Sequence, residues 1–118
     1  MKPYEFSFER LNVWKKARKL ASNIYTITSS FPESEKFGIT NQIRRAAISV
    51  TANIAEGSSR FSRKEQSRFY QISFSSLMEL LSHLYISVDL KYLDEKSLEE
   101  IKPEILEVSM MLNALHKK

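Results

Sequence analysis

Apolar residues recur every three or four positions near the N-terminus, and this spacing predicts an amphipathic helix over about residues 8–30. One apolar row of this segment includes Trp14 and Ile24. A second row lies beside it and repeats every seven residues: Val13, Leu20 and Ile27. Together the two rows are wider than the stripe of roughly 100° that a single core face requires. Because the residue before a proline avoids the helical region, we expect this helix to end before Pro32.

The same period marks three further helices, expected over about residues 40–57, 63–89 and 95–115. Each begins near a side chain that can accept a hydrogen bond from a free N–H group of the first turn. Thr40 is the expected N-cap of the second helix, with Ser34 as an alternative, and Asp94 is the expected N-cap of the fourth. Ser62 and Glu65 have the spacing of a capping box, which predicts the start of the third.

Two sequence features predict how these helices pack. The core row of the second helix is rich in small residues, among them Ala46, Ala47 and Gly57, so a neighbouring helix can approach it closely. Pro103 lies within the fourth helix, where it removes one backbone hydrogen bond. We therefore expect the fourth helix to kink or restart at Pro103.

The four segments predict an all-α protein: an antiparallel, up-down-up-down four-helix bundle that forms a single domain over residues 1–118. Two glycines and three prolines are too few for the frequent turns of an all-β fold. The chain has no cysteine, which excludes disulfides and cysteine-based zinc sites. The first ten residues contain charges and no apolar leader. We therefore expect a soluble, cytoplasmic protein.

Residues 69–88 form the most apolar stretch, in which Glu79 is the one charged residue. The length of the stretch raises the question of a membrane span. It also contains Gln71, His83 and five serines, which favour a helix packed against protein. We expect no membrane contact.

The helices carry more apolar surface than a single four-helix bundle needs, since the first has two rows and the third is apolar over about half its circumference. Large exposed apolar patches are rare on soluble monomers, so a second copy of the chain is the simplest partner. We assign the row of Val13, Leu20 and Ile27 to the subunit interface. The alternative is a thicker core within one chain.

Residues suited to catalysis are scarce. Glu79 and His83 are four positions apart and can touch on one helix face, but no nucleophile with an activating base adjoins them, which favours an ordinary hydrogen bond. A di-metal bundle would need Glu-x-x-His pairs, and neither His83 nor His116 has a glutamate three residues before it. We expect no enzymatic activity, no metal, no cofactor and no small-molecule substrate.

A polar row flanks the core of the second helix, formed by Gln42, Ser49, Asn53 and Glu56. We expect these side chains to bond polar groups of a neighbouring helix or subunit and so to fix its register. For Glu56 the alternative is an i,i+4 ion pair with Arg60, worth about 0.2–0.5 kcal/mol.

The net charge of +4 is unevenly distributed, because residues 1–68 hold 13 basic and 6 acidic side chains. Arginine and lysine suit phosphate contacts, and Phe61 lies among them as a surface on which an unpaired base could stack. The expected phosphate contacts are Lys15, Lys16, Lys19, Arg44, Arg45, Arg63, Lys64 and Arg68. Charge of this kind can also serve solubility alone.

Several stretches together resemble one known family. They are residues 42–50 (QIRRAAISV), 53–57 (NIAEG), 13–17 (VWKKA), 24–25 (IY), 31–38 (FPESEKFG), 79–80 (EL) and 92–93 (YL). The sequence resembles the four-helix-bundle proteins encoded in intervening sequences of bacterial 23S rRNA genes, over about residues 8–115. That family is in turn similar to the accessory variability protein of diversity-generating retroelements, a basic pentameric bundle that binds nucleic acid and a reverse transcriptase.

The resemblance implies a bacterial cytoplasmic protein that assembles as a ring-like homopentamer. It also favours nucleic-acid binding, although most members have no assigned biochemical function. The sequence therefore predicts a non-enzymatic oligomeric scaffold that binds RNA or DNA phosphates through basic helix faces. The alternative is an adaptor whose oligomer presents helix faces to a protein partner, without nucleic acid.

Overall fold

The computed structural model describes residues 4–117, and within that range it is all-helical. It contains four α-helices: α1 (Asn12–Thr28), α2 (Ile39–Ser58), α3 (Arg63–Asp89) and α4 (Glu95–Lys117). Two short 3-10 helices, η1 (Ser7–Arg10) and η2 (Glu33–Glu35), precede α1 and α2. The described residues form no strand. The expected all-α fold class is confirmed.

The α1 helix begins four residues later than the expected start at residue 8. Residues 7–10 form the 3-10 turn η1 instead, and Leu11 interrupts the helix with an extended backbone (φ −74°, ψ 123°). The aromatic rings of Phe8 and Trp14 pack edge-to-face with their centroids 4.8 Å apart, so the turn is anchored on the first turn of α1.

Local side-chain chemistry defines the starts of α3 and α4 as expected. The Ser62 hydroxyl accepts a hydrogen bond from the backbone N–H of Glu65 (3.1 Å), and the Asp94 carboxylate accepts one from the N–H of Ser97 (2.7 Å). Two hydrogen bonds involving Ser97 lower the pKa of Asp94 below its ordinary value. Both N-caps are confirmed.

The expected N-cap at Thr40 is wrong, because α2 begins at Ile39 and its N-cap residue is Gly38. Thr40 lies within the first turn of the helix, where its side chain is buried. The Glu35 side chain serves this end instead, since its Oε1 accepts a long hydrogen bond (3.4 Å) from the N–H of Ile39.

Pro103 does not restart the fourth helix, because α4 runs without a break from Glu95 to Lys117. The proline lies on the exposed side of α4. The carbonyl group four residues earlier, at Glu99, loses its usual N–H partner, and on an exposed side water can take that place.

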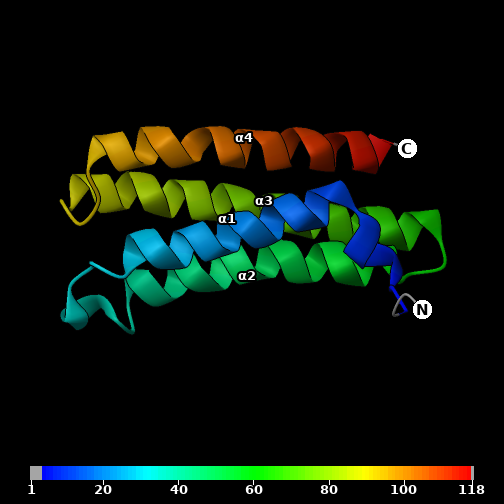
Figure 1. Ribbon diagram of the computed structural model, residues 1–118, viewed down its shortest axis with the longest axis horizontal. Coiled ribbons are helices and arrows are strands. Elements are labelled where there is room, and N and C mark those ends of the chain that lie inside the picture. The colour runs from blue at the N-terminus through cyan, green and yellow to red at the C-terminus, as the bar shows by residue number, and fades with distance from the viewer. Residues whose placement is uncertain (1–3, 118) are drawn as a thin grey trace.

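Figure 1 shows the four helices lying lengthwise beside one another. The α1–α2 and α3–α4 connections lie at one end of the molecule, and the α2–α3 turn lies at the other, next to both chain termini (Figure 1). The buried side chains of all four helices form one core, whose largest members include Ile24, Ile43, Leu77 and Ile105.

The assignment of Val13, Leu20 and Ile27 to the subunit interface is wrong for most of that row. Val13 and Leu20 are only 4% and 1% exposed and lie in the core of the single chain, while Ile27 is half-buried against that core. The reason is that α1 packs against both α2 and α4, and two neighbours require a broad apolar face. The thicker core, the alternative considered above, holds for this row.

Candidate nucleic-acid interface and assembly surface

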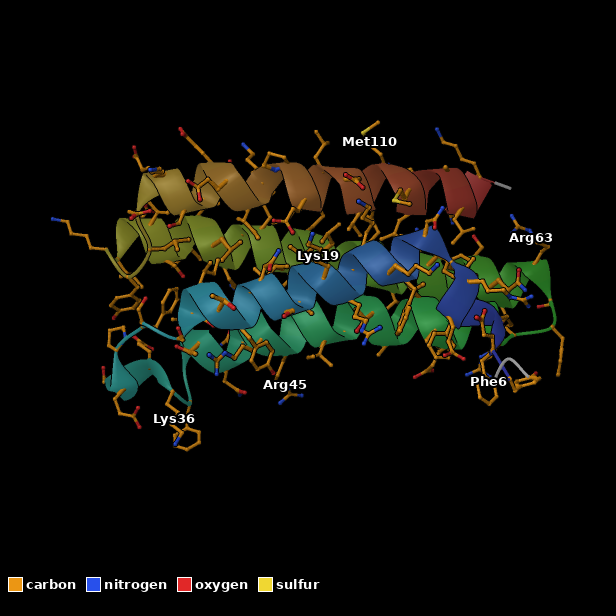
Figure 2. The ribbon with its side chains drawn as sticks, in the orientation of Figure 1. Phe6, Lys19, Lys36, Arg45, Arg63 and Met110 are labelled. Atoms are coloured by element: carbon orange, nitrogen blue, oxygen red, sulfur yellow. The ribbon has the colours of Figure 1, made fainter. Side chains whose placement is uncertain are left out.

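The expected phosphate contacts lie in three regions of the surface. Figure 2 shows Lys19 on α1, Arg45 on the outer side of α2, and Arg63 at the end of the molecule that holds the α2–α3 turn. Since these three labelled residues lie well apart in the view, the structure does not gather all eight predicted contacts into one patch.

On α1, the three predicted lysines differ in their surroundings. The Lys16 ammonium lies 3.1 Å from the carboxylate of Glu107 on α4. Lys15 and Lys19 are exposed, and no carboxylate among the described residues lies within ion-pair distance of either. Lys15 and Lys19 are therefore the more available phosphate contacts of this group.

On α2, the adjacent arginines serve different purposes. Arg44 donates from Nε to the Thr28 hydroxyl (2.9 Å) and from Nη2 to the Tyr25 carbonyl (3.3 Å), and its guanidinium lies 4.5 Å from the centroid of the Tyr25 ring. These contacts hold the last turn of α1 against α2, so Arg44 has a structural role. Arg45 is exposed and has none of these contacts.

The α2–α3 turn concentrates the remaining basic residues at one end of the bundle. We call this region the basic end, and it comprises Arg60, Phe61, Arg63, Lys64 and Arg68. Phe61 is fully exposed, with arginines before and after it in the chain. Arg63 and Lys64 are exposed and have no described carboxylate within ion-pair distance.

Two arginines of the basic end are partly engaged by neighbours. Arg60 lies 3.7 Å from the Glu56 carboxylate, and Arg68 lies 3.6 Å from that of Glu65. Both guanidinium groups also lie near the Phe69 ring, at 4.5 and 5.8 Å from its centroid. Exposed ion pairs of this kind contribute only about 0–1 kcal/mol, so a polyanion can displace the carboxylates at low cost.

The electrostatic influence of the basic end reaches inward. Burial raises the pKa of the Tyr70 phenol above its ordinary value, and the nearby Arg63 guanidinium opposes part of that rise.

The two ends of the molecule carry opposite charge. Residues 59–68, at the basic end, include four basic side chains and one acidic one. Residues 89–100, which comprise the last residue of α3, the α3–α4 connection and the first turns of α4 at the opposite end, include two basic and five acidic side chains. A polyanion is therefore attracted to one end of the bundle and repelled by much of the other.

The expected polar row of α2 is only partly engaged as predicted. Asn53 donates from Nδ2 to both the carbonyl and the hydroxyl of Ser49 (2.9 and 3.0 Å), and the Ser49 hydroxyl pairs with that of Ser76 on α3 (2.9 Å). Asn53 thus reaches the neighbouring helix through Ser49. Glu56 forms the i,i+4 ion pair with Arg60 noted above, and Gln42 is exposed with no side-chain hydrogen bond among the described residues.

An apolar surface that the sequence analysis did not single out lies between α3 and α4. We call it the α3–α4 seam, and it is lined by the apolar side chains of Met78, Leu81, Pro103, Ile105 and Leu106, together with Glu99, Lys102 and Ser109. Leu106 and Met110 are 58% and 62% exposed, and a shallow hollow of about 390 Å³ lies between the two helices. Figure 2 shows Met110 pointing away from the bundle.

Other chemistry finds little support in the described part of the chain. The Glu79 carboxylate and His83 Nε2 lie 3.3 Å apart, the contact expected for an ordinary i,i+4 pair. No group of three histidine, aspartate or glutamate side chains within residues 4–117 is arranged to hold a metal ion. Over the same residues, no helix combines the length and apolar character needed to span a bilayer.

Comparison with known proteins gives one family and one fold. The sequence model of the 23S rRNA-intervening sequence proteins matches residues 9–114. A crystal structure from Bacteroides thetaiotaomicron VPI-5482, described as a protein of unknown function from the S23 ribosomal protein family, superimposes with a TM-score of 0.82. The match covers 90% of this chain and 99% of the other at 23% identity, so it shows the fold alone. No curated protein matches the chain.

Proposed function

Because the chain belongs to the 23S rRNA-intervening sequence protein family, we propose that it is a non-enzymatic, oligomeric scaffold that binds RNA or DNA phosphates at the basic end of an antiparallel four-helix bundle. The observation that carries this proposal is the basic end itself. There, Arg63 and Lys64 are exposed without a described carboxylate partner, and Phe61 stands fully exposed beside them.

The chemistry of the basic end favours a nucleic acid over a simple anion. Arginine donates two parallel hydrogen bonds to a phosphate, and lysine adds a mobile point charge. An exposed phenylalanine costs solubility unless something covers it, and the face of an unpaired base suits it. The opposite charge of the far end orients the molecule so that the basic end meets a polyanion first.

Oligomer formation rests on the α3–α4 seam. Leu106 lines a hollow that burial against another copy of the chain would remove from water, and Met110 is exposed one turn further along α4. We place the contact at this seam, and the family resemblance favours a ring-like homopentamer in the bacterial cytoplasm. A ring repeats each basic end, so weak phosphate contacts add up along one polyanion.

The nucleic-acid proposal is tested by fluorescence anisotropy with labelled structured RNA and with DNA, over a salt series from about 50 to about 200 mM. We expect the affinity to fall steeply with salt. The paired substitution Arg63→Glu with Lys64→Glu should weaken binding at least about tenfold at low salt, since it reverses two phosphate contacts. The matched control, Lys91→Glu with Lys96→Glu, makes the same change in net charge at the opposite end and should have a much smaller effect.

Different results would favour the adaptor. If the unmodified protein shows no salt-dependent binding to either nucleic acid, the phosphate-binding proposal is wrong, and presentation of helix faces to a protein partner becomes the better explanation. Equal losses in the test pair and the control pair would mean that only net charge matters, which would remove the role of the basic end.

Assembly is tested separately by size-exclusion chromatography with light scattering. We expect a particle of several chains. Leu106→Glu, which places a charge in the α3–α4 seam, should reduce the particle mass, while Ala52→Glu on the exposed side of α2 should leave it unchanged. A wild-type particle of one chain, or a Leu106→Glu particle of unchanged mass, would refute assembly through this seam.

A further inference from the structure

A second hollow lies at the opposite half of the molecule from the basic end. It opens beside the first three turns of α2 and has a volume of about 550 Å³. Its wall is formed by Tyr25, Lys36, Phe37, Asn41, Arg45 and Ile48, together with the buried Thr40 and the half-buried Arg44. In Figure 2, Lys36 and Arg45 lie along the same edge of the molecule, far from Arg63. We call this site the α2 hollow.

Thr40 lines the α2 hollow, and its side chain carries an unsatisfied polar group. Thr40 is only 7% exposed, and its hydroxyl oxygen has no hydrogen-bond partner. A buried hydroxyl without a partner costs free energy, so natural proteins rarely keep one without a reason. Beside it, Arg44 is fixed by Thr28 and Tyr25, which gives the hollow a rigid positive charge.

The rim of the α2 hollow combines cations with an exposed ring. Phe37 is 88% exposed, and the Lys36 ammonium lies 5.6 Å from the centroid of its ring. Arg45 is exposed on the α2 side, and Lys36 has only a long contact of 3.9 Å with the Glu33 carboxylate. Asn41 adds an exposed amide, which can both donate and accept a hydrogen bond.

Besides Glu33, a second carboxylate near the hollow restricts where an anion can bind. Glu35 lies at the start of α2, where it accepts hydrogen bonds from the Ile39 N–H (3.4 Å) and from the Tyr92 hydroxyl (2.9 Å). The hydrogen bond to Glu35 raises the pKa of Tyr92. The end of the helix is therefore already occupied by a negative charge, and a second anion is favoured only on the flank of α2 near Arg45.

We propose that the α2 hollow holds one unpaired nucleotide of a single-stranded RNA or DNA, with its phosphate at Arg45 and Lys36 and its base against Phe37. The hollow has the size of an ordinary small-ligand site, about 300–1,000 Å³. Duplex is excluded from it, because the faces of paired bases are hidden in the stack. This inference rests on the proposed nucleic-acid binding and adds which form of nucleic acid is preferred.

A substitution of Thr40 can distinguish a residue that binds the nucleotide from one that only packs in the fold. Thr40→Val keeps the shape of the side chain and replaces the unpartnered hydroxyl with a methyl group, so it should stabilise the fold. If the hydroxyl serves the nucleotide, the same variant should bind a single strand more weakly. A residue that only packs would not change stability and binding in opposite directions.

The test uses the full chain and a labelled single-stranded RNA of about 12 nucleotides, compared with the same sequence as a duplex. Phe37→Leu and Arg45→Gln should each weaken single-strand binding at least about fivefold and leave duplex binding nearly unchanged. Phe61→Leu serves as the matched aromatic control at the basic end, and its effect should be independent of the Phe37 effect. Titration calorimetry with AMP distinguishes a free nucleotide from one held within a strand, and we expect AMP alone to bind far more weakly.

Each contrary result has a distinct meaning. The protein could bind nucleic acid while Phe37→Leu and Arg45→Gln leave single-strand binding unchanged, or weaken duplex binding to the same extent. In either case the α2 hollow is not the binding site, and the proposal for the basic end is unaffected. AMP bound as tightly as the strand would make it a site for a free nucleotide. A fall in particle mass in Phe37→Leu would make the hollow a subunit contact. Absence of any nucleic-acid binding overturns the proposed function as well.

Discussion

Gly57 sets how closely α2 and α3 approach near the basic end. A Cβ atom added at this position would lie 2.7 Å from Cε1 of the Tyr70 ring and 3.0 Å from both Cδ1 of that ring and Cβ of Phe69. Tyr70 is buried, so its ring cannot move aside freely. The close packing of α2 against α3 therefore requires a glycine at this position. The backbone conformation does not require one, since the φ of Gly57 is not positive.

Gly57→Ala brings two opposing contributions to stability. Alanine favours the helix over glycine by about 1 kcal/mol, which would stabilise the protein if space were free. Forcing a methyl group into a filled contact costs about 1–3 kcal/mol, and a separation of 2.7 Å places this case in the upper part of that range. We therefore expect a net loss of about 1–2 kcal/mol in the free energy of unfolding.

The assay is urea unfolding followed by far-ultraviolet circular dichroism at one fixed protein concentration, because the stability of an oligomer depends on concentration. The same change is made in a Tyr70→Leu background, where the ring is gone. There we expect Gly57→Ala to be neutral or to stabilise by up to about 1 kcal/mol. Stabilisation in the wild-type background, or an identical effect in both backgrounds, would refute the steric argument.

Three further predictions concern hydrogen bonds that the structure assigns to single side chains. Arg44→Lys should lower the free energy of unfolding by about 1 kcal/mol in urea melts, because lysine cannot make the same two bonds, whereas the exposed neighbour Arg45→Lys should have no measurable effect. Ser73→Ala removes a buried bond of 2.8 Å to the Val50 carbonyl and should also cost about 1 kcal/mol. The pKa of Asp94 is lowered in the folded protein, so the ionised carboxylate stabilises the fold at pH values above its ordinary pKa of 3.8. This stabilisation is lost as the pH falls further. Thermal melts of Asp94→Asn should therefore show a shallower decline of the melting temperature in this acid range than those of the wild type.

Local chemistry was the part of the fold most readily predicted from sequence. The starts of α3 and α4 follow from Ser62 and Asp94, whose side chains bond backbone groups only three residues away. The prediction of Thr40 as an N-cap was wrong because the Glu35 side chain accepts the hydrogen bond from the start of α2 instead. The sequence offers both side chains as acceptors, and composition does not decide between them. Helix period likewise predicted most of the core.

The wrong predictions concern contacts between different helices of the bundle. The apolar row that includes Leu20 was wrongly assigned to a subunit interface. The width of the buried face of a helix depends on how many helices surround it, and the sequence of one helix does not reveal that number. Arg44 was expected to be available for phosphate, yet its partner Thr28 lies 16 residues earlier. Leu106 falls outside the periodic stripe of α4, so it became visible as part of a surface only when α3 was in place.

The separation of charge along the bundle has a geometric consequence for any closed assembly of this chain. Rotation about an axis parallel to the helices keeps every copy pointing the same way, so a ring built in this manner is a two-faced disc. One face gathers the arginines of each α2–α3 turn, and the other gathers the carboxylates around Asp89 and Asp94. Such a disc would meet a polyanion with its basic face first and leave its acidic face turned outward, where it is open to a cationic partner.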